Sequence, residues 1–109
     1  MCSERIAVWL GDILTNIDDI AEYVGDADAT AFTGSKLVRD AVERCLERIS
    51  EAVSRVSRSG FPLEKLEPAI AWRDIRGLGN RLRHAYDTVE SEFIWSIIER
   101  DLEPLTRSR

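Results

Sequence analysis

The sequence predicts an all-α fold, specifically an antiparallel up-and-down four-helix bundle. Apolar residues recur at alternating steps of four and three through most of the chain, which is the spacing of helices with one buried face. No segment alternates apolar and polar residues with a period of two, so we expect no strand. The connections between the helical segments are short, which favours antiparallel neighbours in a bundle. We expect a single domain over residues 1–109, with its core from about residue 3 to residue 105.

The first two predicted helices cover residues 3–24 and 35–58. Gly25 and Asp26 end the first, and Ser59 and Gly60 close the second. Residues 27–34, between them, are small and polar, so we expect a loop or one extra short helical turn. The two apolar seams consist of Ile6, Leu10, Ile13, Ile17, Ile20 and Val24, and of Val38, Val42, Cys45, Ile49, Ala52 and Val56.

The third and fourth predicted helices follow a connector at residues 61–67. Pro68 suits the first turn of a helix, so the third helix is expected from Pro68 to about Ala85, with its inward face made of Trp72, Ile75, Leu78 and Leu82. Asp87 and Glu90 have the spacing of a capping box that opens the fourth helix. Its apolar face is Ile94, Ile97, Ile98, Leu102 and Leu105, and residues 106–109 form a tail.

Composition excludes several classes of protein. The longest apolar run has five residues, Ile6 to Leu10, whereas a membrane helix needs roughly 20. The N-terminus lacks the apolar stretch of a signal peptide, so we expect a cytoplasmic protein without a membrane partner. Two cysteines, Cys2 and Cys45, without a CxxC motif argue against a disulfide scaffold and a structural zinc site. We predict no metal and no cofactor.

Charge is distributed unevenly along the chain. The net charge of −5 and the pI of about 4.9 argue against a general nucleic-acid coat protein, whose surface is basic. The segment from Trp72 to His84 nevertheless carries four arginines and one acid, so it is +3. Arginine offers a planar fork of donors that suits phosphate and carboxylate groups.

The helices carry more apolar residues than their inner seams require. Surplus apolar surface on a small bundle often marks an interface with a partner, and we expect a homodimer. The surplus residues are Trp9, Leu37, Leu46, Val53, Phe93 and Trp95.

The third helix contains the residues with chemical potential. Arg76, Asn80, Arg83 and His84, the only histidine, are spaced to project from one side of it. A histidine can accept and donate a proton near pH 7, and arginines beside it can hold a phosphate and stabilise negative charge. A metal-free ribonuclease needs those two functions. The same residues are also compatible with a surface histidine that stabilises the last helical turn. Gly77 and Gly79 weaken the helix, which indicates close approach of a ligand or of another helix.

Residues 80–86, Asn-Arg-Leu-Arg-His-Ala-Tyr, preceded by Trp72-Arg73-Asp74-Ile75, resemble the HepT-like branch of the HEPN superfamily. The similarity extends from about residue 5 to residue 105. It implies an all-α homodimer with two motifs across one cleft, and a metal-independent ribonuclease that acts as the toxin of a type II toxin–antitoxin pair. It also implies a partner nucleotidyltransferase of the MntA type as antitoxin, which would silence the toxin by transferring AMP to Tyr86. His84 matches the catalytic histidine and Asn80 the polar residue of the motif.

The sequence departs from the family pattern at one position. The family has an arginine five residues before the histidine, where this chain has Gly79. Arg76, Arg81 and Arg83 are the nearest substitutes. We expect His84 to act as base and acid with Arg83 and Arg76 on the phosphate, while the side chains expected to bind RNA are those of Asn80, Arg81 and Arg73.

Three functional interpretations remain open at this point. The first is the ribonuclease toxin. The second is a catalytically silent HEPN protein that binds nucleotide, RNA or the nucleotidyltransferase, which Gly79 favours. The third is a plain dimerisation module, which the surplus apolar residues favour.

Overall fold

The described part of the chain is helical and contains no strand. In this computed structural model the structure describes residues 2–68, 70, 72–82 and 88–102. The elements are α1 (Cys2–Val24), α2 (Ala29–Gly34), α3 (Lys36–Arg58), α4 (Leu63–Leu66), α5 (Trp72–Leu82), α6 (Thr88–Ile97) and a π-helical turn, η1 (Ile98–Leu102). The predicted all-α class is confirmed.

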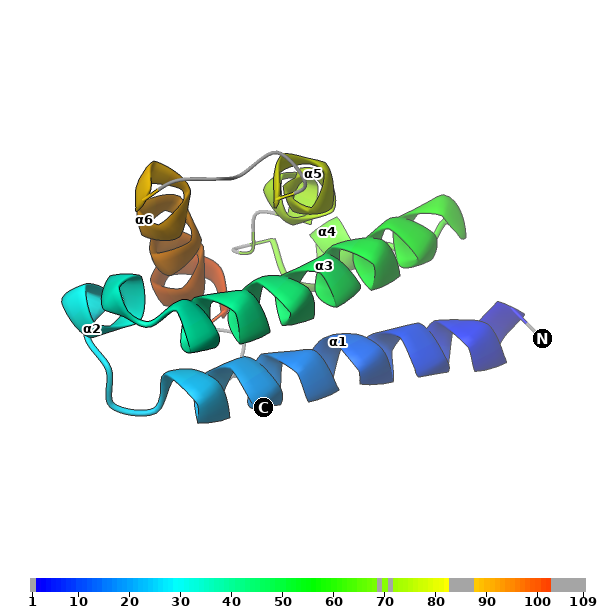
Figure 1. The fold of residues 1–109 in the computed structure, drawn as a ribbon. Helices are drawn as coiled ribbons and strands as arrows, with labels where there is room; N and C mark the ends of the chain where they lie inside the picture. The colour runs from blue at the N-terminus through cyan, green and yellow to red at the C-terminus, as the bar shows by residue number, and fades with distance from the viewer. Residues whose placement is uncertain (1, 69, 71, 83–87, 103–109) are drawn as a thin grey trace.

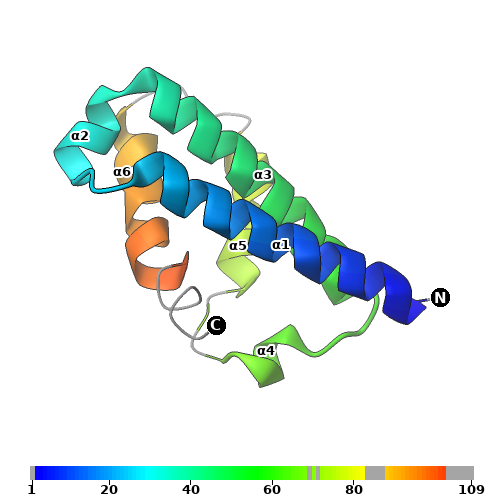
Figure 2. The same ribbon diagram turned by 90° about the horizontal axis from the view of Figure 1, so that it is seen from below.

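The long helices α1 and α3 lie side by side and run in opposite directions (Figures 1 and 2). Gly25, with a φ of +55°, ends α1 in a left-handed conformation that glycine adopts without steric cost. The Asp28 carboxylate then accepts a hydrogen bond from the Ala31 amide and caps α2. Ser35 caps α3 in the same way through the Val38 amide. Two side-chain caps thus turn the chain back on itself within about ten residues.

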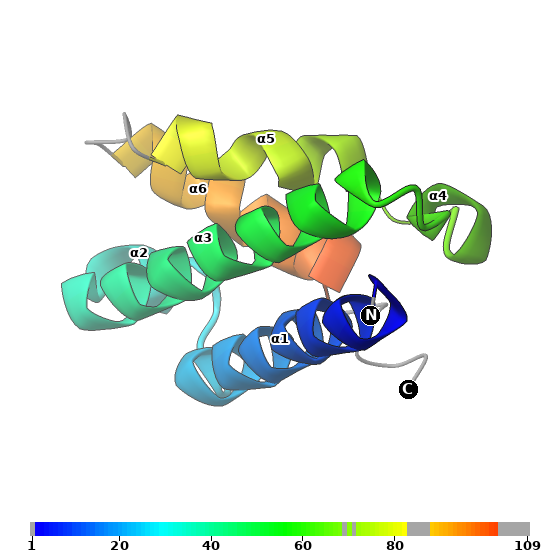
Figure 3. The same cartoon turned by 90° about the vertical axis from the view of Figure 1, so that its right-hand side faces the viewer.

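Helix α3 is the central element. Seen from the side, α1 lies on one face of α3, and α5 and α6 lie on the other (Figure 3). Figure 1 shows α5 nearly end-on while α1 and α3 lie in the plane of the view, so the axis of α5 crosses theirs. Antiparallel packing holds for α1 and α3, whereas α5 crosses both of them (Figure 1). The up-and-down bundle as a description of the whole chain stays a prediction.

Both predicted seams form the core. The middle of the α1 seam and nearly all of the α3 seam are buried, including Cys45. Burial raises the pKa of the Cys45 thiol. Two of the surplus apolar residues, Leu46 and Val53, are also buried, and Trp9, Phe93 and Trp95 pack against the core. Of that predicted surplus only Leu37 is well exposed, at 81%.

The predicted start of the third helix is wrong. Helix α5 begins at Trp72, and Pro68 lies in a turn before it. The buried Trp72 indole N–H donates to the Glu67 carbonyl at 3.0 Å, and the Ile70 amide donates to the same carbonyl at 3.2 Å. These two bonds tie Ile70 and Trp72 to Glu67 ahead of the helix, so the helix starts at Trp72 and not at Pro68. The predicted connector contains a short helix, α4, anchored by the buried side chain of Leu63.

The fourth predicted helix is α6, which ends at Ile97 and is followed directly by the π-helical turn η1. Leu105 of its predicted apolar face lies outside the described residues. Ile94 and Ile97 are buried as expected. Asp87 of the predicted capping box lies outside the described residues. Within the described part of the chain, no helix is both long and apolar enough to cross a membrane.

Candidate functional site

Helix α5 carries the described part of the predicted site. Its inward face is confirmed for Trp72, Ile75 and Leu78, which are buried, while the side chain of Leu82 lies outside the described ones. Arg73 and Arg76 project from its other side. Asn80 and Arg81 belong to the helix, but their side chains lie outside the described ones. Three further predicted site residues lie outside the described residues: Arg83, His84 and Tyr86.

Arg76 is held by α3 and α4. Its Nη1 donates to Ser57 Oγ at 3.1 Å and to Glu64 Oε1 at 2.6 Å, and its side chain is 30% exposed. The hydrogen bond from Arg76 holds the pKa of the Glu64 carboxyl below its ordinary value. Leu82, the last residue of α5, lies six residues further along, about 9 Å up the helix axis. Because its hydrogen-bond partners are Ser57, in the last turn of α3, and Glu64 of α4, the guanidinium of Arg76 points toward the C-terminal end of α3 and toward α4.

The main chain of Arg76 is also tied to α3. Ser50 Oγ donates to the Arg76 carbonyl at 2.9 Å, and Ser50 is only 4% exposed. Ser50 and Ser57 are seven residues apart, so they lie on one face of α3. Both ends of Arg76 are thus positioned by serines of the central helix, and the register between α3 and α5 is set at this point.

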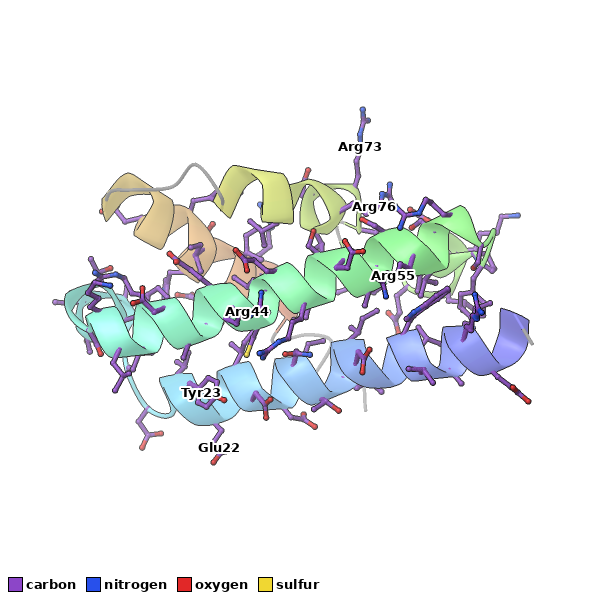
Figure 4. The ribbon with its side chains drawn as sticks, turned by 45° about the vertical axis from the view of Figure 1, so that its right-hand side comes forward. Glu22, Tyr23, Arg44, Arg55, Arg73 and Arg76 are labelled. Atoms are coloured by element: carbon purple, nitrogen blue, oxygen red, sulfur yellow. The ribbon has the colours of Figure 1, made fainter. Side chains whose placement is uncertain are left out.

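Arg73 has a different environment. It is exposed and extends away from the body of the protein, apart from Arg76 (Figure 4). No ion pair links it to any residue in the described ranges. Its neighbour Asp74 lies 3.9 Å from Arg100 of η1. The structure does not bring Arg73, predicted to bind RNA, together with Arg76, predicted to hold the phosphate, and Arg73 is the one that is free to meet a ligand from solvent (Figure 4).

A polar groove that sequence reasoning did not identify runs between α1 and α3. It has a volume of about 630 Å³ and extends to Arg76 of α5. Its α1 wall is formed by Trp9, Asp12 and Asn16. The α3 wall includes three arginines and two glutamates: Arg44, Glu47, Arg48, Glu51 and Arg55. These charged residues recur at steps of three and four, and that periodicity is the signal that could have located the groove from the sequence.

The described part of the chain contains no cluster of side chains that could bind a metal ion. No group of three or more histidine, cysteine or acidic side chains there is arranged to hold a metal ion. The groove offers guanidinium groups, an amide and an indole ring, which are suited to phosphate and base recognition, together with three carboxylates.

Comparison with known proteins places this sequence in a family. The sequence model of the family described as "Ribonuclease HepT-like" matches residues 13–108. "Putative RNase MJ1380" of Methanocaldococcus jannaschii is 34% identical over 107 residues, covering 98% of this chain and 95% of that protein. "Probable ribonuclease HepT" of Thermococcus cleftensis is 30% identical over 97 residues, covering 89% of this chain and 86% of that protein.

A relative with a second activity in its name also matches. "Gamma-glutamylcyclotransferase and putative RNase MJ0434" of Methanocaldococcus jannaschii is 29% identical over 102 residues, which cover 92% of this chain and 44% of that protein. The search of solved structures finds no match. The family match spans α5 and the segment after it, and the resemblance inferred from residues 80–86 is confirmed: the chain belongs to the HepT-like ribonuclease family.

Proposed function

We propose that this chain is a ribonuclease that cleaves RNA without a metal ion. The observation that carries the proposal is the family match over residues 13–108, together with relatives of nearly the same length that bear ribonuclease names. His84 is the general base and acid, and Arg83 and Arg76 hold the phosphate. The side chains that bind the RNA are those of Asn80, Arg81 and Arg73.

The proposed reaction is an internal transesterification. His84 removes the proton of a ribose 2′-hydroxyl, whose oxygen attacks the adjacent phosphorus. The bond from phosphorus to the 5′-oxygen breaks, and that oxygen takes up a proton. The products are a 2′,3′-cyclic phosphate and a 5′-hydroxyl. Arginines contribute by stabilising the charge that grows on the phosphoryl oxygens in the transition state.

The biological setting that we propose follows the family resemblance. The chain acts in the cytoplasm as a single domain and a homodimer, with RNA in a cleft between two copies of α5. It is the toxin of a type II pair, and an MntA-type nucleotidyltransferase silences it by transferring AMP to Tyr86. The +3 charge between Trp72 and His84 supports RNA binding in that cleft, while the acidic remainder limits non-specific binding.

A second candidate is a catalytically silent HEPN protein that binds nucleotide, RNA or the nucleotidyltransferase. Gly79 occupies the place of the family's motif arginine. The nearest described substitute, Arg76, is bonded to Glu64 and Ser57. To serve catalysis, Arg76 must exchange Glu64 for a phosphate oxygen. This observation favours binding without cleavage over an intact active site.

The experiment that separates the two is RNA cleavage in EDTA by wild type and by His84→Ala prepared identically. We expect wild type to cut and the variant to lose at least about 100-fold in rate, the low end of what a general acid–base group contributes. Intact mass must first show that Tyr86 carries no AMP. If neither protein cuts, the silent module is the better description. If both cut equally, a contaminating nuclease is responsible and the ribonuclease proposal loses its support.

Arg58→Gln is the matched control for this assay. Arg58 is exposed in the last turn of α3 and lies outside the groove and α5. We expect it to cleave RNA as wild type does. Loss of activity in this variant would indicate a general dependence on positive charge rather than a localised site.

A further inference from the structure

One arginine of the groove between α1 and α3, Arg48, forms no ion pair with a described residue. Arg44 pairs with Glu47 at 3.1 Å, and Arg55 pairs with Glu51 at 3.0 Å. Arg48 lies between these pairs, and no carboxylate lies within 4.0 Å of it among the described residues. It is exposed and lies close to the buried Cys45 thiol. Arg48 is therefore available to a single anionic group that enters the groove.

The opposite wall offers a buried amide with an unused acceptor. Asn16 is 7% exposed and lines the groove. Its Nδ2 donates to the Asp12 carbonyl at 2.8 Å, and its Oδ1 accepts no hydrogen bond from any described residue. A buried acceptor without a donor is costly, so a donor from a ligand or from water is favoured at this position. An exocyclic amine of a nucleobase is such a donor.

Trp9 provides an aromatic surface on the same wall. It is half-buried, packs against the core and lines the groove. Trp9 and Asn16 are seven residues apart, so they lie on one face of α1, about 10 Å apart along its axis. A nucleobase stacks on an indole ring irrespective of its sequence.

The size and charge of the groove suit one nucleotide unit rather than a long polyanion. Its volume of about 630 Å³ is that of a small-molecule site. Three acids, Asp12, Glu47 and Glu51, also line it and disfavour more than one or two phosphates. Arg76 lines its edge, which connects the groove to α5. Figure 4 shows Arg44, Arg55 and Arg76 along α3, while Arg73 extends away from them.

We infer that this groove is a subsite for one nucleotide of single-stranded RNA. Trp9 stacks on the base, Asn16 Oδ1 accepts from its exocyclic amine, and Arg48 holds its phosphate. This inference rests on the proposed RNA-directed function. The stacking ring and the unused amide acceptor favour RNA over an acidic protein, which would need the cation but neither of these groups.

The test is binding of a 2′-O-methyl oligoadenylate hexamer, which cannot undergo the transesterification, measured by fluorescence anisotropy. We expect Arg48→Gln to weaken binding about tenfold, because it removes one charge-assisted contact. Trp9→Leu should weaken it at least about fivefold through lost stacking. The matched control, Arg58→Gln on the same helix, should bind within about twofold of wild type. Far-ultraviolet circular dichroism and a thermal melt establish that each variant is folded.

Salt dependence gives a second readout that a structural defect would not change. Removal of one phosphate contact to a single strand should lower the slope of log Kd against log salt by about 0.7 in Arg48→Gln, and by nothing in Arg58→Gln. Unchanged binding and slope in Arg48→Gln would overturn the subsite. If the groove variants changed the mass of the protein in solution and left RNA binding unchanged, the subsite would also be overturned. The groove would then be an interface between protein chains.

The outcomes also separate the subsite from the proposed function. If wild type cuts RNA in a His84-dependent way but the groove variants bind and cut normally, only the subsite fails. If wild type binds the hexamer through Arg48 and Trp9 but never cuts RNA, the subsite stands and the ribonuclease fails. If wild type neither binds nor cuts, both are wrong.

Discussion

At the scale of single residues, Arg76 differs most from its predicted role. The sequence suggested a free cation near the motif, but the structure has the guanidinium of Arg76 between Ser57 and Glu64. Neither partner could be inferred from α5, since both lie on other elements, 12 and 19 residues away. Periodicity along one helix predicts which side of it a residue occupies, and the partners on that side depend on tertiary packing.

Gly77 provides a prediction at the same scale. It is exposed, and a Cβ added there would meet no atom of the described residues within 4 Å, so close contact with a described helix does not explain this glycine. Gly77→Ala should raise the free energy of unfolding by about 1 kcal/mol through helix propensity. Thermal melts should show a Tm higher by roughly 4 °C.

Gly60→Ala is the contrasting control. Gly60 has a φ of +89°, a conformation that alanine adopts only with strain, so the Tm of the Gly60→Ala variant should fall below that of wild type. A lower Tm for Gly77→Ala as well would contradict the open environment of Gly77. A higher Tm with lost RNA cleavage would show that this space is used by RNA or by a second copy of the chain.

At the scale of elements, α4 matters because it ties the connector to α5. The predicted connector at residues 61–67 contributes to the fold in two ways. Leu63 is buried in the core, and Glu64 accepts a hydrogen bond from Arg76. The late start of α5 also depends on tertiary contacts, since the Glu67 carbonyl accepts hydrogen bonds from the Ile70 amide and the Trp72 indole. Pro68 is compatible with a helix start and with a turn, and tertiary contacts selected the turn.

The Glu64–Arg76 pair makes stability depend on pH. Its hydrogen bond lowers the pKa of Glu64 in the folded state, so the pair stabilises the protein above the unfolded carboxyl value of about 4.3. That contribution is lost as the pH falls through the lower, folded-state pKa. Glu64→Gln should therefore melt below wild type at pH 7, and the difference in Tm should close as the pH is lowered toward 3.

Glu22→Gln serves as the control, since Glu22 is exposed on α1, far from Arg76 (Figure 4). Its Tm should follow wild type across the series. A difference between Glu64→Gln and wild type that stays constant with pH would show that the carboxylate charge is irrelevant to the contact.

At the scale of the whole molecule, the surface argument for a homodimer is weaker than the sequence indicated. Leu46 and Val53 are buried in the chain's own core, and the Trp95 ring lies 5.3 Å from that of Phe32. The exposed large apolar residues of the described chain are spread over three helices: Val8, Leu14 and Tyr23 of α1, Leu37 of α3 and Leu66 of α4. The homodimer remains a prediction of the family resemblance.

Sedimentation equilibrium tests this prediction. We expect a mass that approaches twice 12.4 kDa as protein concentration rises, and that falls on dilution, because the described surface offers no large apolar interface. A mass of 12.4 kDa at every concentration would remove the proposed cleft between two copies of α5 and require a site within one chain.

The sequence alone established the helical class, the two buried seams and the family, because each depends on periodicity or on a contiguous motif, which residues 80–86 carry without the family's arginine at position 79. The crossing of α5 over α3, the turn before Trp72, the partners of Arg76 and the groove beside Arg48 emerged from the folded chain. Each of them joins residues of different helices. Such contacts depend on how side chains fill space between elements, and the spacing of residues along one helix carries no record of that packing.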